Sequence, residues 1–192
     1  MEVVMKDDKV LVKSDYSNEF VKGARKLNGK WTGSAWSFDS RNEERVRNLL
    51  LDVYGDDGTG SKINTVTVQL DLDKFSENHT SGYLREVELF GRVLVRRQYR
   101  DSEVRLHDSV IVTQGGFPSR GGSVKNPRLS EEEGTILEIK DVPMSIYEKA
   151  LEEYSDCIML ADKDDEYKKA LLKEKEQILA RLEEIEKLLE EK

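Results

Sequence analysis

The sequence predicts an α+β protein with a small N-terminal strand-helix-hairpin-helix module, a central antiparallel β barrel or sandwich, and a C-terminal coiled-coil helix. Three observations lead to this fold class. Apolar and polar residues alternate in the middle of the chain, apolar residues recur at helical spacing on both sides of it, and a turn-rich stretch follows the first part at residues 55–61. The expected domains are an α/β module over residues 1–60, a β-rich basic domain over 61–144 and a helical region over 145–192.

The N-terminal module is expected to contain a short strand, a helix, a β-hairpin and a second helix. Residues 10–12 predict the strand, and Ser17 or Asn18 is expected to cap a helix whose apolar residues lie at helical spacing. Residues 30–38 predict the hairpin, and Ser40 is expected to cap the second helix through a capping box.

The first helix and the hairpin share a pattern of aromatic, small and basic residues, namely Phe20, Ala24, Leu27, Gly29, Lys30, Trp31, Trp36 and Phe38. Over about 45 residues this segment resembles a small module of phage, plasmid and Firmicute hypothetical proteins and, more distantly, the HARP domain that accompanies annealing helicases. The resemblance implies an association with DNA-fork structures, but the sequence contains no helicase motor, so fork remodelling is not implied. It also implies a mobile-element setting, in which such binders serve in counter-defence by sequestering a nucleotide immune signal or blocking a nuclease.

The central part alternates between apolar and polar residues, as strands with one buried face do. Residues 66–72 show this pattern most clearly, and further strands are expected near 87–95, 104–112 and 135–139. A small antiparallel barrel or sandwich is the most economical arrangement for them. A long glycine-rich loop over residues 115–128 lies between the last two strands.

Charge separates the central part from the rest of the protein. The whole chain has 36% charged residues and a net charge of -8, which argues against general nucleic-acid coating. Residues 84–129, in contrast, carry nine cations and five anions. We therefore expect the central part to bind an anion, and a phosphate group is the most natural ligand.

The glycine-rich loop and the arginines before it are the predicted ligand-binding residues. Glycine lets backbone N–H groups approach an anion closely, while arginine supplies charge and tyrosine a surface on which a base can stack. The candidates are Arg92, Arg96, Arg97, Tyr99, Arg100, Arg105, Gly115, Gly116, Arg120, Gly121, Gly122, Ser123, Lys125 and Arg128. Two plainer interpretations remain open: a mobile hairpin loop that happens to be basic, and arginines that each balance a nearby carboxylate.

Other candidate sites are weaker. Trp31 and Trp36 are possible stacking residues, although such tryptophans more often seal a core. No Walker or Rossmann motif and no Ser-His-Asp arrangement is present, and His79 and His107 are far apart in the sequence. We therefore expect a non-enzymatic protein without cofactor or metal.

The C-terminal segment over residues 167–192 predicts an amphipathic helix. Its apolar residues follow the a/d pattern of a coiled coil, with Leu171, Ile178, Leu182, Ile185 and Leu189 as the expected oligomerisation residues. Leu172 and Leu179 widen this stripe, which leaves docking on the body or a higher-order bundle open. A homo-oligomer is the expected assembly.

Cys157 is the only cysteine, which fits a reducing compartment. No stretch is apolar enough for a signal peptide or a membrane span, so we expect a cytoplasmic protein, in a bacterial host cell if it is phage-encoded.

Two functional hypotheses follow from the sequence. The first is an oligomeric, non-enzymatic binder of a phosphate-bearing ligand, either a nucleotide or a nucleic acid. The second is a protein-interaction inhibitor, similar in action to an anti-CRISPR or DNA-mimic protein, whose acidic helical part engages a nucleic-acid-binding enzyme. An enzyme is the minority interpretation.

Overall fold

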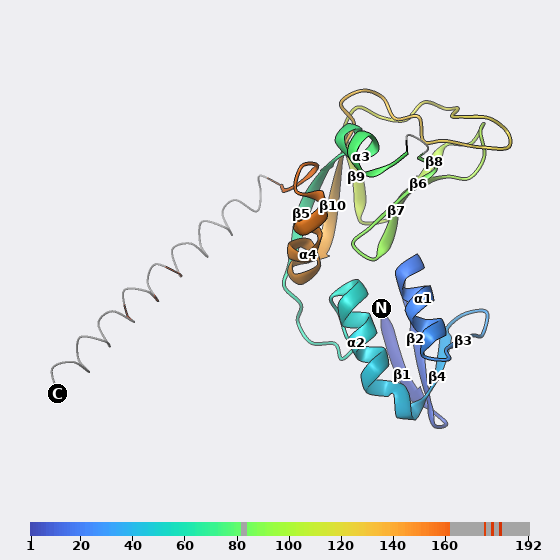
Figure 1. Ribbon diagram of the computed structural model, residues 1–192, viewed down its shortest axis with the longest axis vertical. Helices are drawn as coiled ribbons and strands as arrows, with labels where there is room; N and C mark the ends of the chain where they lie inside the picture. The colour runs from blue at the N-terminus through green and yellow to red at the C-terminus, as the bar shows by residue number, and fades with distance from the viewer. Residues whose placement is uncertain (82–83, 162–174, 176–177, 179–180, 182–192) are drawn as a thin grey trace. The chain divides into compact units, whose positions relative to one another are not determined.

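The computed structural model describes residues 1–81 and 84–161, together with 175, 178 and 181 (Figure 1). The chain divides into two compact units, Met1–Met159 and Leu160–Lys192. The elements in chain order are β1 (Glu2–Lys6), β2 (Lys9–Lys13), α1 (Asn18–Lys26), β3 (Lys30–Trp31), β4 (Trp36–Asp39), the 3-10 helix η1 (Ser40–Asn42), α2 (Glu43–Tyr54), β5 (Thr65–Asp71), α3 (Leu72–His79), β6 (Glu86–Leu89), β7 (Arg92–Arg97), β8 (Val104–Leu106), β9 (Val110–Gln114), β10 (Ile136–Pro143), α4 (Met144–Tyr154) and β11 (Ile158–Leu160).

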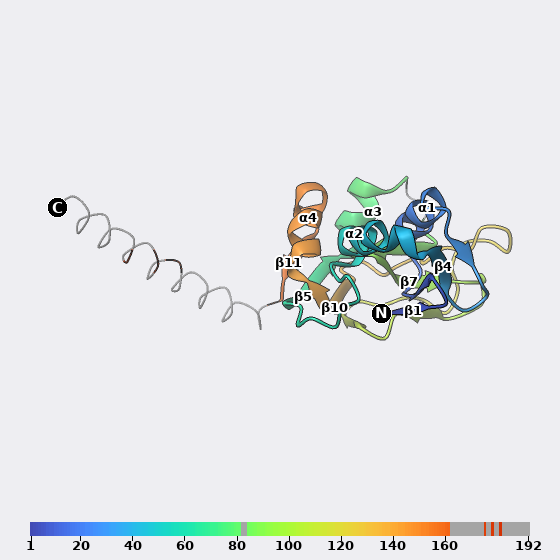
Figure 2. The same ribbon diagram turned by 90° about the horizontal axis from the view of Figure 1, so that it is seen from below.

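The described strands form three antiparallel sheets, and none of these closes into a barrel. Their strand orders are β1-β2-β4-β3, β11-β5-β10-β9 and β6-β7-β8. The prediction of a central barrel or sandwich is therefore wrong. The physical reason is that α3 and α4 pack on β5 and β10, so helices cover the apolar face that a second sheet would cover in a sandwich. Figure 2 shows the four helices α1 to α4 together on one side of the strands.

The predicted C-terminal helix is not among the described elements, so this part of the predicted fold is not supported either. Of the five expected oligomerisation residues only Ile178 is described, and its side chain is 58% exposed. Leu171, Leu182, Ile185 and Leu189 lie outside the described residues. Self-association through this segment stays a prediction.

The first sheet and its two helices enclose a core of their own. The side-chain oxygen of Ser17 accepts a hydrogen bond from the backbone N–H of Phe20, which confirms Ser17 as the cap of α1. The core joins β2 and β4 to α1 and α2 and contains Val10, Val12, Phe20, Ala24, Phe38, Val46, Leu50 and Val53. Alternate residues of β2 therefore face the helices, as its burial pattern shows.

Several elements differ from the sequence-based expectations. Strand β1 was not predicted; it joins β2 through Asp7 and Asp8, both of which have positive φ angles. The second helix is preceded by η1, which Asp39 caps in place of Ser40. The expected strand over residues 104–112 is instead two strands in different sheets, because the chain turns between β8 and β9. Helix α3 was also missed; Asp71 ends β5 and caps that helix.

The turn between β6 and β7 joins the third sheet to the N-terminal module. Phe90 and Gly91 both have positive φ angles, as a tight hairpin turn requires. A Cβ atom on Gly91 would lie 2.4 Å from the backbone carbonyl oxygen of Val53 in α2. Only glycine therefore allows the turn to approach the helix so closely.

We expect Gly91→Ala to lower the free energy of unfolding by at least about 2 kcal/mol, because it combines left-handed backbone strain with a clash against backbone. Gly60→Ala is the matched control. Gly60 has φ +75° against +74° for Gly91, but nothing lies within 4 Å of its added Cβ, so we expect a loss of only about 1 kcal/mol. Urea denaturation measures the free energy of unfolding of both variants. Equal losses in the two variants would refute a role for the contact between Gly91 and α2.

Candidate functional site

Two of the predicted ligand-binding arginines lie in the interior, where they hold backbone carbonyl groups. The Arg92 guanidinium donates hydrogen bonds to the carbonyl oxygens of Lys140 (3.2 Å) and Asp141 (3.0 Å), and burial lowers the pKa of Arg92. Arg97 is fully buried and donates to the carbonyl oxygens of three residues, Ser102, Pro118 and Leu129. Both guanidinium groups therefore hold backbone carbonyl groups of other segments in place.

Glycines of the loop pack closely against neighbouring groups. A Cβ atom on Gly121 would lie 2.1 Å from the carbonyl oxygen of Arg128 and 2.9 Å from Arg97 Nε. A Cβ on Gly115 would similarly lie 2.7 Å from the Cα of Thr135. Gly121 thus allows the loop to fold around Arg97, and Gly115 allows it to pack on Thr135, so close packing accounts for these two glycines without a phosphate.

The remaining predicted cations have different surroundings. Arg96 and Arg105 lie opposite each other across β7 and β8. Arg96 forms an ion pair with Glu86 at 3.2 Å. Arg105 and Lys125 are exposed, as are Gly122 and Ser123, whereas Gly116 and Arg128 are half-buried. Of these cations, Arg96 is thus balanced by a carboxylate, as the plainer interpretation expects.

Arg100 and Arg120 form a small cluster, in which both side chains meet at one carboxylate. Arg100 Nη2 lies 3.0 Å and Arg120 Nε 3.1 Å from oxygens of Asp101. The backbone N–H of Gly121 also donates to the carbonyl oxygen of Arg100 at 2.9 Å. Tyr99, 66% exposed, precedes Arg100 directly. We call Tyr99, Arg100 and Arg120 the basic corner, where an arginine of the turn after β7 and an arginine of the glycine-rich loop come together.

The two tryptophans differ in their surroundings. Trp36 is half-buried and packs edge-on against Phe20, with ring centroids 6.2 Å apart, so it belongs to the N-terminal core. Trp31 is 57% exposed and lies beside Trp36 at 5.9 Å between centroids. Only Trp31 offers an open face for stacking.

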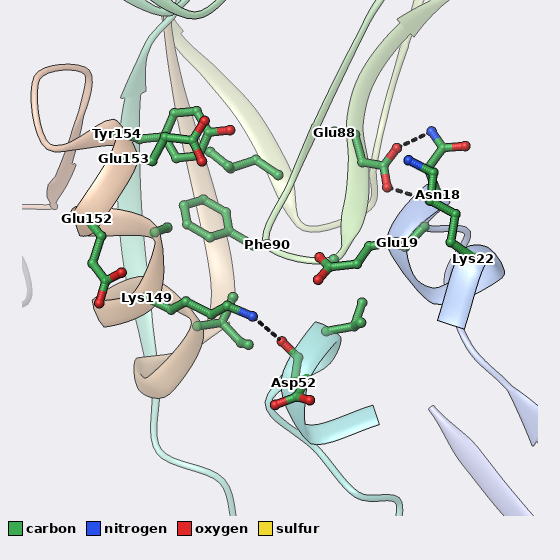
Figure 3. Close-up of a pocket in the computed structure, with 16 residues that line it drawn as sticks. Asn18, Glu19, Lys22, Asp52, Glu88, Phe90, Lys149, Glu152, Glu153 and Tyr154 are labelled. Carbon is green, nitrogen blue, oxygen red and sulfur yellow. Dashed lines mark hydrogen bonds between the residues drawn. The ribbon is translucent and has the colours of Figure 1, made fainter. Parts of the chain in front are cut away.

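The described residues also form a cleft of about 600 Å³ that sequence reasoning missed (Figure 3). Its walls come from α1, α2, α4 and the turn between β6 and β7. The floor is apolar and includes Val53, Leu89, Phe90, Ile146 and Ala150. Phe90 lies in the middle of the view, between α4 on one side and α1 on the other.

Carboxylates dominate the charge of this cleft. Five line it, namely Glu19, Asp52, Glu88, Glu152 and Glu153, against the two cations Lys22 and Lys149. We call these five residues the acidic rim. Within the part of the chain that the structure describes, none of the five forms an ion pair within 4 Å. The cleft therefore has a negative potential that its own side chains do not cancel.

Two hydrogen-bonded contacts hold the walls of the cleft in place. The Glu88 carboxylate accepts hydrogen bonds from the backbone N–H of Asn18 at 2.6 Å and from its side-chain amide at 2.5 Å, which ties the hairpin to the start of α1. Lys149 Nζ donates to the backbone carbonyl oxygen of Asp52 at 3.2 Å, which ties α4 to α2. Figure 3 shows both contacts as dashed lines, one between Glu88 and Asn18 and the other between Lys149 and Asp52. Lys149 thus binds a carbonyl group and leaves the Asp52 carboxylate available.

Among the described residues, no helix has both the length and the apolar character needed to cross a membrane. Comparison with known proteins gives no match to any family model, curated protein or solved structure. The resemblance of the N-terminal segment to the HARP domain therefore stays a prediction.

Proposed function

We propose that this protein is a non-catalytic binding protein that holds a positively charged segment of a partner protein in its acidic cleft. The acidic rim carries this proposal: five carboxylates surround one apolar hollow and form no ion pair among the described residues. The interior positions of Arg92 and Arg97 favour this hypothesis over a broad phosphate-binding surface.

The composition of the cleft fits lysine or arginine side chains. The aliphatic stems of these side chains are stabilised by packing on an apolar surface, while their charged ends remain near carboxylates. A floor containing Phe90 and Ile146 beneath an acidic rim provides both environments. A hollow of about 600 Å³ has the size of an ordinary ligand pocket, so it suits a few side chains of a peptide segment.

The proposed partner class is a protein that uses the same cations to bind nucleic acid. Carboxylates placed against those cations compete with phosphate for them, so occupation of the cleft blocks the partner from its nucleic acid. A counter-defence role would follow from the resemblance to phage and plasmid proteins.

Fluorescence anisotropy with a labelled oligo-lysine peptide tests the proposal on the full chain. We expect saturable binding whose affinity falls as salt rises, because the contacts are charged and partly exposed. A labelled oligo-glutamate peptide of equal length serves as the control and should not bind. Failure of the oligo-lysine peptide to bind at low salt would refute the proposal.

A second candidate function, phosphate binding, is favoured by one observation, the convergence of Arg100 and Arg120 beside the exposed Tyr99. On this hypothesis the phosphate displaces Asp101 from the two guanidinium groups. We expect Arg100→Ala with Arg120→Ala to weaken binding of a labelled single-stranded oligonucleotide by about tenfold. Arg45→Ala, at an exposed arginine of α2, is the control, and equal weakening by it would contradict a site at the basic corner.

A further inference from the structure

Three side chains with different metal-binding atoms converge outside the acidic cleft. His79 is the last residue of α3, and Asp156 and Cys157 lie in the turn after α4. One ligand atom from each of the three lies within 4.8 Å of the others, and His79 Nε2 is 2.8 Å from an oxygen of Asp156. Because residues 155–157 form a turn, consecutive side chains can point to one place, which an extended strand would prevent.

Neighbouring groups hold the three side chains in position. The side-chain amide of Asn78 donates to the second Asp156 oxygen at 2.7 Å, which orients the carboxylate. The His79 ring packs against Tyr154 and Phe75, with centroids 4.8 Å and 5.8 Å away. Hydrogen bonds and packing of this kind orient ligands around bound metals in other proteins.

Cys157 is fixed by its backbone. Its carbonyl oxygen accepts a hydrogen bond from the backbone N–H of Asp71 at 2.8 Å, and its side chain is buried. Burial raises the pKa of the Cys157 thiol to about 12, so without a metal ion the sulfur keeps its proton at neutral pH. A bound cation removes that proton by stabilising the thiolate.

The donor set selects the kind of metal. An imidazole nitrogen, a carboxylate oxygen and a thiolate sulfur are all ligands of Zn²⁺, with bond lengths of about 2.0–2.3 Å. Four such ligands in a tetrahedron lie about 3.3–3.7 Å apart. The observed separations run from 2.8 Å to 4.8 Å, so shifts of about 1 Å or less bring all three atoms into range.

We propose that His79, Asp156 and Cys157 form a binding site for a divalent metal ion of the zinc type, with water as the fourth ligand. On binding, the Cys157 thiol releases its proton to solvent and gives up its hydrogen bond to the carbonyl oxygen of Tyr154. The sulfur, the His79 nitrogen and an Asp156 oxygen then bond the ion, and the hydrogen bond between His79 and Asp156 is broken. The ion then links the end of α3 to the turn after α4. This site lies outside the sequence-based expectations, which included no metal.

Titration of the full chain with Co²⁺, followed by competition with Zn²⁺, tests this site. Cys157 is the only cysteine, so a thiolate-to-Co²⁺ charge-transfer band can come from no other residue. We expect this band to saturate at one equivalent and to disappear when Zn²⁺ is added. Absence of the band would overturn the proposal.

Variants locate the bound ion. Cys157→Ser should abolish the charge-transfer band, and Asp156→Asn and His79→Ala should each weaken Co²⁺ binding by at least about tenfold. Asp156 is exposed, so its variant keeps the test valid if the change at the buried Cys157 prevents folding. His107→Ala is the control, because His107 lies beside a different carboxylate, that of Asp15, and it should leave Co²⁺ affinity unchanged. Unchanged affinity in Asp156→Asn and His79→Ala would overturn the proposal.

Discussion

Replacement of Arg97 by methionine is expected to lower the free energy of unfolding by about 4 kcal/mol. The Arg97 guanidinium is fully buried and donates hydrogen bonds to the carbonyl groups of Ser102, Pro118 and Leu129. Hydrogen bonds from charged groups are stronger than neutral ones, and each buried carbonyl left without a partner costs about 1–3 kcal/mol. Methionine roughly keeps the volume of the side chain, so the loss reports mainly on these bonds.

Arg96→Met is the matched control for this change. Arg96 is the neighbouring residue of β7, but it is exposed and forms an ion pair with the half-buried Glu86. Exposed ion pairs contribute about 1 kcal/mol or less, so we expect a correspondingly small loss. Urea denaturation gives both values. A loss below about 1 kcal/mol for Arg97→Met would show that the loop does not depend on this arginine.

Charge reversal at the acidic rim is expected to have the largest effect on binding. Glu19, Asp52 and Glu153 come from α1, α2 and α4, and all three are exposed. We expect the triple variant Glu19→Lys, Asp52→Lys and Glu153→Lys to weaken oligo-lysine binding by about 100-fold, which corresponds to about 2.7 kcal/mol. The reason is that attraction becomes repulsion at three points around one hollow.

A second triple variant distinguishes the effect of charge in the cleft from the effect of the net charge of the protein. Glu103→Lys, Asp108→Lys and Glu133→Lys change the net charge by the same amount at exposed positions outside the cleft. We expect this variant to weaken binding only a few-fold, because distant exposed charges are screened by salt. Equal weakening by both triple variants, measured by anisotropy at the same ionic strength, would mean that the peptide responds to net charge alone.

Local patterns in the sequence were sufficient to predict those elements whose formation depends on neighbouring residues. Ser17 caps α1 as expected because its side chain needs only the backbone three residues away. Strand β5 alternates between buried and half-buried or exposed residues as its sequence does. The barrel prediction failed because an apolar strand face does not show what covers it. Here α3 and α4 cover it, and α3 follows β5 without a break.

A local pattern also does not show which distant groups a side chain will contact, and this explains why the surroundings of the candidate site residues were not predicted. Arginine is usually exposed, so the burial of Arg97 depends on carbonyl groups from later segments that only the folded chain brings together. The acidic rim was missed for a related reason. Its residues range from Glu19 to Glu153, and each looks like an ordinary surface carboxylate in the sequence.

The position of the bound peptide tests the central claim most directly. In an NMR titration of the ¹⁵N-labelled full chain with oligo-lysine, we expect amide shifts at Asn18, Asp52, Phe90 and Glu153, which line the cleft. The amides of Tyr99 and Arg120 at the basic corner should stay unchanged. Shifts that avoid the cleft residues, or that spread evenly over exposed carboxylates elsewhere, would contradict the proposed function.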